Sequence, residues 1–308
     1  MFLTQLAHDY LTNYENINHS TVTMDYESTR IIFNISLNLL QHSQVFKRKA
    51  SIIKQNIFAK KFTALLEKDI IETEKKRQRI IANNALSGGE KSVLKDDDYP
   101  IPEIPIIITT LIEEIERRGL YEEGIYRIAG TMDIVQNMRR EIDTNFKTGI
   151  KLISDCEIHA VANLVKQLFR ESPDPLIDYE TYQALAAVEK NIQDQERAGR
   201  YSSALKNLSS CNKKILIYLI DHFKRVDECS GQNKMNINNI AKVWALNLMQ
   251  RSNDDHFQVN TTHDSIKQPT SKIMPNMEML KEVEEVARMN QIMTEILMYS
   301  KKGWLDLS

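Results

Sequence analysis

The chain has 308 residues, of which 42% are hydrophobic and 27% are charged, a balance that is ordinary for a globular protein with a sizeable core. Its formal net charge of −2 excludes a global basic field for nucleic acid, so any attraction to phosphate must be local. Only nine glycines and seven prolines punctuate long periodic segments, and this pattern predicts an all-α protein.

Catalytic and metal-binding motifs are missing from the sequence. It contains no GxxxxGK[ST] phosphate loop, HExxH, CxxC or GxSxG, so it predicts no metal, no cofactor and no self-sufficient active site. The three cysteines, Cys156, Cys211 and Cys229, lack metal-type spacing and favour a reduced, cytoplasmic setting. The longest apolar runs are too short to span a bilayer, and no secretory signal is recognised.

Residues 1–98 differ in character from the rest of the chain. Their apolar spacing predicts helices over residues 29–40 and 59–83. The basic residues at 47–54 form either a solvated face, the favoured interpretation, or a weak peripheral contact with an acidic membrane. The charged, glycine-containing stretch 86–99 predicts a linker. We therefore place a domain boundary there, between an N-terminal helical extension ending at residue 98 and a second domain over 99–300.

Three prolines open the second domain, and a helix is expected over residues 106–118, with Gly119 at its end. The sequence YEEGIYRIAGT follows at residues 121–131. After it, Thr131 is a candidate N-cap for a helix that reaches about residue 145.

One arginine stands at the centre of YEEGIYRIAGT. Gly124 and Gly130 on either side of Arg127 permit positive φ angles that other residues resist. Ile125 and Ile128 are predicted to pin the loop to the core, so that Arg127 points outward. A planar, permanently charged guanidinium suits phosphate oxygens, although an ordinary surface salt bridge is the alternative.

The next predicted helix, residues 155–171, carries both an apolar and a polar face. Ser154 and Glu157 have the spacing of a capping box at its start. Its polar stripe includes Lys166 and Arg170, for which a solvated helix face is the alternative. Two prolines in SPDPL then stop the helix. The apolar face is predicted to contain Val161, Leu164, Val165, Leu168 and Phe169.

Four further helices complete the prediction. Asn247 lies beside the buried face of the helix predicted over residues 237–249, where a local hydrogen bond is its simplest role. The last is expected to bury Leu280, Val283, Val286, Met293, Ile296 and Leu297, and the segment 252–271 before it is irregular. The four helices are expected over residues 178–197, 212–226, 237–249 and 278–299.

Three blocks in this order resemble the Rho-family GTPase-activating protein (RhoGAP) domain: GIYRIAGT, HAVANLVKQLFRESPDPLI and NINNIAKVWALNLMQR. The resemblance covers residues 99–299. It implies an all-α, RhoGAP-like bundle of about nine helices, here with an extra N-terminal helical segment. It also implies a GTP-bound Rho-family small GTPase as partner, which itself binds GTP and magnesium. It implies a cytoplasmic location, with membranes or cytoskeleton reached through that partner.

The resemblance also assigns residues. Arg127 matches the arginine finger, and Lys166 and Arg170 match the basic pair that supports the finger loop and engages the GTPase. Asn247 matches an asparagine that contacts the GTPase, and Pro175 matches the second proline of the helix-ending motif. The family usually has Gly-Pro before this asparagine, where this chain has Ala-Leu, which leaves the role of Asn247 less secure.

Two other functions compete with GTPase activation. A silent module of the same fold would bind a GTPase without accelerating hydrolysis, and a helical scaffold would not bind one. The retained Arg127 argues against the silent module.

Overall fold

The computed structural model describes residues 57–86, 99–249 and 276–307. By its contacts the chain divides into two units, residues 1–54 and 55–308, and every described residue belongs to the second. The predictions for residues 29–40, 47–54, 87–98 and 252–271 therefore lie outside the described residues.

The described part of the chain is helical and contains no strand, which confirms the all-α class. From α5 onward its helices agree with the expected bundle of about nine, and they follow a long helix, α4, and a short 3-10 helix, η1. None of these helices is long and apolar enough to cross a membrane. The elements are η1 (Ile57–Ala59), α4 (Phe62–Leu86), α5 (Ile106–Arg118), α6 (Met132–Thr144), α7 (Phe146–Ile153), α8 (Ile158–Arg170), α9 (Tyr179–Ala186), α10 (Asp194–Leu205), α11 (Ser210–Glu228), α12 (Ser230–Asn233), α13 (Ile237–Leu248) and α14 (Asn276–Lys301).

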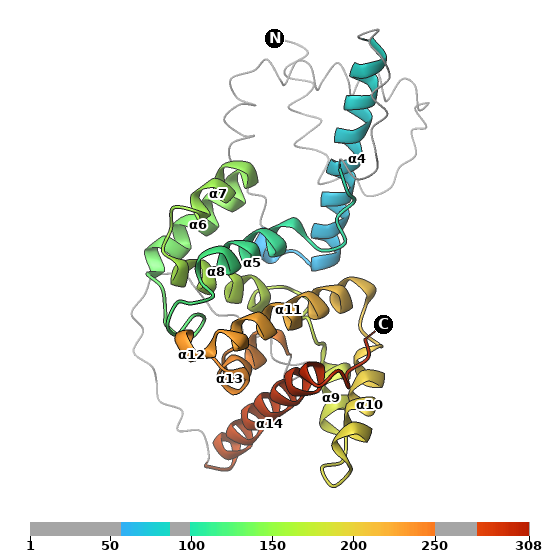
Figure 1. Cartoon of the computed structure of the whole chain (residues 1–308), viewed down its shortest axis with the longest axis vertical. Coiled ribbons are helices and arrows are strands. Elements are labelled where there is room, and N and C mark those ends of the chain that lie inside the picture. Colours follow the sequence, from blue (N-terminus) through green and yellow to red (C-terminus); the bar gives the residue numbers. More distant parts are fainter. Residues whose placement is uncertain (1–56, 87–98, 250–275, 308) are drawn as a thin grey trace, which may run out of the picture. The chain divides into compact units, whose positions relative to one another are not determined.

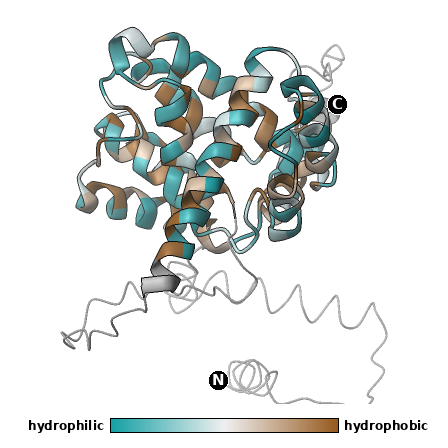
Figure 2. Ribbon diagram, turned by 90° about the horizontal axis from the view of Figure 1, so that it is seen from below, coloured by the Kyte–Doolittle hydropathy of each residue, from teal (hydrophilic) through white to brown (hydrophobic). Residues whose placement is uncertain are grey.

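Helices α8 and α13 form the centre of the packing (Figure 1). Helix α8 contacts α5, α6 and α13, while α13 also contacts α11 and α14. The apolar face predicted for α8 is fully in the core, because its five members recur at helical spacing and are all buried. Figure 2 shows the same arrangement, with apolar stripes turned toward neighbouring helices.

Helix α7 was not predicted from the sequence. Asn145 both ends α6 and caps α7, since its side-chain oxygen accepts from the backbone N–H groups of Lys147 and Thr148 at 3.1 and 3.4 Å. Gly149 lets the two helices touch, because a Cβ at that position would lie 2.5 Å from the backbone nitrogen of Ile142. The signal in the sequence that could have predicted α7 is Asn145, because asparagine is a preferred N-cap residue.

The predicted helix over residues 178–197 is wrong as a single helix, since the structure has α9 and α10 instead. The two helices bury different faces: Tyr182 and Leu185 on α9, and Ala198 and Tyr201 on α10. In one straight helix Ala198 would be rotated by roughly 220° from Leu185, so both faces could not reach the core. The chain breaks and restarts in a new orientation.

Two further expectations need correction. The Ser154–Glu157 capping box is wrong: Ser154 ends α7, and Glu157 is the N-cap residue of α8 without a side-chain cap bond. Leu280 and Val283 of α14 are 62% and 61% exposed, so the beginning of that helix does not bury its apolar face. Thr131 does occupy the N-cap position of α6, again without a side-chain cap bond.

The first turn of α4 belongs to the same core as the later helices. Phe62 is 1% exposed, and its ring centroid lies 5.1 Å from that of Phe169 on α8. Phe58 and Leu65 are also buried in this core. The boundary expected between residues 98 and 99 stays a prediction, but a fragment that starts at 99 would remove these side chains from the core.

We expect Phe62→Ala to lower the free energy of unfolding by about 3–5 kcal/mol, because it leaves a cavity against Phe169. Ile71→Ala is the matched control on the same helix, since Ile71 is 52% exposed and its truncation should cost less than about 0.5 kcal/mol. Denaturant unfolding of the whole chain measures both. If Phe62→Ala lowered the free energy of unfolding as little as Ile71→Ala does, the packing of α4 on the core would not stabilise the domain.

Candidate functional site

The loop between α5 and α6 is built around a left-handed turn at Gly124. This glycine is buried and has a φ of 68°, so it adopts the positive angle expected from the sequence. Its N–H donates to the carbonyl of Asn233 at 2.7 Å, and its own carbonyl accepts from Arg127 and Ile128, each at 2.8 Å. The loop is therefore closed on itself and tied to the end of α12.

Tyr126 anchors this loop to the core. Its side chain is 0% exposed, and its ring meets that of Trp244 edge-on with centroids 5.1 Å apart. Tyr126 also has a φ of 70°, which is costly for a residue with a Cβ and persists only where the surroundings enforce it. Ile125 is buried as expected, but Ile128 is 43% exposed, so its predicted role as a second pin is wrong.

Arg127 follows the anchor and is exposed. Its side chain makes no hydrogen bond or ion pair with the described residues, in contrast to the side chains of Arg117 and Arg118 at the end of α5. The backbone on both sides of Arg127 is held, while its side chain is open to solvent. Its placement is that of an outward-pointing cation on a rigid loop.

Gly130 is required for a different reason from the one expected. It does not have a positive φ, but a Cβ there would lie 2.2 Å from the backbone nitrogen of Ala160. At Gly130 the backbone of the loop therefore packs directly against the first turn of α8. Glu157 strengthens the contact, since its carboxylate accepts from the N–H of Thr131.

Lys166 of α8 binds the backbone of the loop. Its ammonium donates to the carbonyl oxygen of Tyr126, which is the residue directly before Arg127. Burial, together with the nearby charge of Arg170, lowers the pKa of Lys166 to about 8. Arg170 lies one turn further along α8, is exposed, and has no ion-pair partner in the described part of the chain. The two basic residues therefore occupy different environments on one helix.

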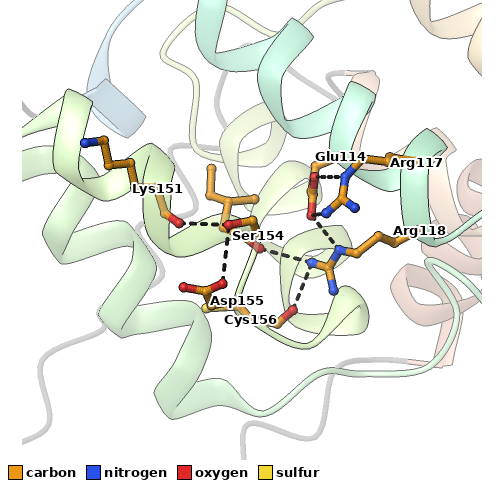
Figure 3. A network of polar contacts seen from close by, with 8 residues as sticks. Glu114, Arg117, Arg118, Lys151, Ser154, Asp155 and Cys156 are labelled. Atoms are coloured by element: carbon orange, nitrogen blue, oxygen red, sulfur yellow. Dashed lines mark hydrogen bonds and ion pairs between the residues drawn. The ribbon is translucent and has the colours of Figure 1, made fainter.

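Hydrogen bonds hold the C-terminal end of α5, the helix that leads into the loop (Figure 3). Arg118 of α5 donates to the carbonyls of Ile153 and Cys156 at 3.0 and 2.9 Å, in the connection between α7 and α8. Asn233, fully buried, donates to the carbonyl of Leu120 at 2.7 Å. Neither set of hydrogen bonds could be predicted from the sequence, because each depends on a single arginine or asparagine outside any motif.

Backbone pairing joins the segment that follows Pro175 to the end of the helix that carries Asn247. The N–H of Ile177 donates to the carbonyl of Leu248 at 2.8 Å, which joins the segment after Pro175 to the end of α13. The carbonyl of Pro175 also accepts from Asn212 at 3.4 Å. Asn247 donates to the carbonyl of Val243 at 2.7 Å, the local hydrogen bond that its helical position suggested.

Comparison with known proteins identifies the family of the region that contains this site. Residues 105–253 match the family model of the RhoGAP domain. The chain therefore contains a RhoGAP domain, as its three sequence blocks predicted.

Curated relatives carry the same region within longer chains. Over 149 residues, 48% of this chain, it is 34% identical to the breakpoint cluster region protein of Homo sapiens and to the active breakpoint cluster region-related protein of Xenopus tropicalis. Rho GTPase-activating protein 24 of Homo sapiens is 30% identical over 153 residues. The aligned stretches span 12%, 17% and 20% of these three relatives, respectively.

The crystal structure of human Rho GTPase activating protein 15 has a related fold. It aligns with 84% of this chain and 97% of its own length, with a TM-score of 0.55. At 20% identity this likeness concerns the fold alone.

We expect Gly130→Ala to lower the free energy of unfolding by about 1–3 kcal/mol, because the added methyl group overlaps backbone atoms that cannot rotate away. Gly199→Ala on α10 is the control, since no atom lies within 4 Å of its new Cβ. That change should stabilise the chain by about 0.4–1 kcal/mol. Urea unfolding compares the two, and a neutral Gly130→Ala would contradict the close approach.

The lowered pKa of Lys166 predicts a pH dependence of stability. Between pH 8 and 10.5 the unfolded chain binds the lysine proton and the folded chain releases it. The free energy of unfolding of the wild type should therefore rise with pH across this window, relative to Lys166→Met. Denaturant unfolding at several pH values measures the difference. Lys242→Met, at an exposed position of α13, is the control: it keeps Lys166, so its free energy of unfolding should follow that of the wild type across this window.

Proposed function

We propose that this chain accelerates GTP hydrolysis by a GTP-bound Rho-family small GTPase and so switches off signalling by that partner. The proposal rests on one observation above all: Arg127 is an exposed cation with no ion-pair partner among the described residues, on a loop whose preceding residues, Gly124 to Tyr126, are buried. The RhoGAP domain and the Rho GTPase-activating relatives support it. In this proposal the chain needs no cofactor of its own, because GTP and magnesium are held by the partner.

Arg127 is proposed to act as an arginine finger supplied in trans. During phosphoryl transfer, negative charge spreads over the phosphoryl oxygens, and a small GTPase alone compensates it incompletely. A guanidinium aimed at these oxygens stabilises the transition state more than the ground state. Such an arginine contributes about 10³–10⁵-fold in rate, which corresponds to roughly 4–7 kcal/mol.

The neighbouring residues receive distinct roles. Lys166 supports the finger through the Tyr126 carbonyl and does not itself reach the phosphate. Arg170 is free to meet a carboxylate of the GTPase. Asn247 uses one amide hydrogen within its own helix, which leaves its other amide groups for contact with the partner. Gly124 and Pro175 shape the two backbone segments that place these side chains.

We expect Arg127→Ala to remove most of the rate acceleration while much of the affinity for the GTPase remains. Single-turnover phosphate release, measured on Rho, Rac and Cdc42 with a Ras-type control, gives the rate. Affinity for the GDP form with and without fluoroaluminate tests transition-state preference, which the variant should lose. Arg127→Lys should recover little activity, because a point charge does not reproduce the guanidinium fork.

Arg140→Ala is the matched control, since Arg140 is an exposed arginine on α6 and should leave the rate unchanged. Wild-type rates in Arg127→Ala would mean that the arginine is structural and that the chain binds a GTPase silently. No binding to any GTP-loaded partner would favour a scaffold.

A further inference from the structure

A buried polar chain leads from the arginine loop to the surface of α5 and α11. The hydroxyl of Tyr126 lies 2.6 Å from Nε2 of His222, and Nδ1 of His222 lies 2.8 Å from Oε1 of Glu116. Arg225 closes the chain, with its Nε donating to the same Glu116 oxygen at 2.9 Å. Four residues from three separate segments thus form one continuous path.

The direction of each hydrogen bond follows from the chemistry of the groups. The ionised carboxylate of Glu116 can only accept, so His222 donates from Nδ1, and Nε2 is left to accept from the Tyr126 hydroxyl. Complete burial lowers the pKa of His222 against the opposing effect of Glu116, which keeps the ring neutral. The hydrogen bond from His222 lowers the pKa of Glu116, and Arg225 adds to the effect.

The position of Tyr126 makes this chain relevant to Arg127. Its left-handed backbone, with φ of 70°, is held at three places: the ring by Trp244, the carbonyl by Lys166 and the hydroxyl by His222. If the hydroxyl is released, the backbone of Tyr126 can relax toward an ordinary negative φ. Arg127 is the next residue, so such a rotation redirects its side chain.

The geometry points to His222 as a positioning residue for Arg127: through the Tyr126 hydroxyl it holds the arginine loop in its left-handed turn, while Glu116 and Arg225 fix the imidazole. The inference rests on the proposed function for its catalytic consequence, since the arginine must be aimed at a phosphoryl group for its orientation to affect a rate. Its structural part, the fixing of the loop, is independent of any GTPase.

Tyr126→Phe tests the inference because it removes the hydroxyl and keeps the ring that packs on Trp244. We expect the stimulated single-turnover rate to fall by about 10²-fold, the cost of a small misplacement of a catalytic group. Affinity for the GTP-bound partner should change little. The amides of Arg127 and Ile128, which donate to the Gly124 carbonyl, should exchange hydrogen faster.

Tyr201→Phe is the matched control. Tyr201 is also 0% exposed, and its hydroxyl donates to a carboxylate oxygen of Glu295 at 2.7 Å, between α10 and α14. This variant also loses the hydrogen bond of a buried tyrosine, in this case a partly buried bond, but its rate and its exchange at Arg127 and Ile128 should match the wild type. Wild-type rate and exchange in Tyr126→Phe would overturn the inference, and so would equal losses in both variants.

A second pair of variants answers the question if Tyr126→Phe does not fold. Glu116→Ala removes the outer support of the imidazole from a partly exposed position, while Glu113→Ala changes an exposed carboxylate on the same helix. Only Glu116→Ala should speed exchange at Arg127 and Ile128. If the wild type stimulates no GTPase, the proposed function fails, whereas the exchange measurements still decide whether His222 holds the loop.

Discussion

The packing of the Tyr126 ring against Trp244 is the contact on which the candidate site depends. Trp244 comes from α13, and its ring also meets Phe169 of α8 and Phe223 of α11, with centroids 5.7 and 5.0 Å apart. The arginine loop is therefore seated on an aromatic cluster shared by three helices. A loop with such an anchor behaves as an extension of the core, because its buried ring cannot move without disturbing close-packed neighbours.

Helix α8 carries two cations that lie in different environments and are therefore suited to different roles in the candidate site. Lys166 is largely buried and points a strong donor at the backbone of the loop, at a desolvation cost that lowers its pKa. Arg170, four residues later, stays in solvent. The sequence places both on one polar stripe, but only the structure separates a residue that supports the loop from one that is available to a partner.

The periodicity of apolar residues predicted most of the helices. The candidate site was predicted from short sequence motifs that lie within and between those helices. The buried face of α8 and the exposure of Arg127 follow from the sequence because each depends on local pattern. The loop itself is not periodic, so nothing in GIYRIAGT distinguished Tyr126 from Ile128 as the anchor. Likewise, the reason for Gly130 lies in Ala160, thirty residues away, which no local rule can detect.

Neither Arg127 nor Arg170 has an ion-pair partner among the described residues that a docking GTPase would have to displace. In the proposed complex, docking would therefore remove water from the two guanidiniums without breaking an ion pair between described residues. The chain as a whole is slightly acidic, with a pI near 6.4. At physiological ionic strength the field of these two cations decays over about 8 Å. An acidic partner would therefore feel little attraction at long range and a sharp, orientation-dependent one at contact, so that complex formation is governed by how the two surfaces are aligned when they meet.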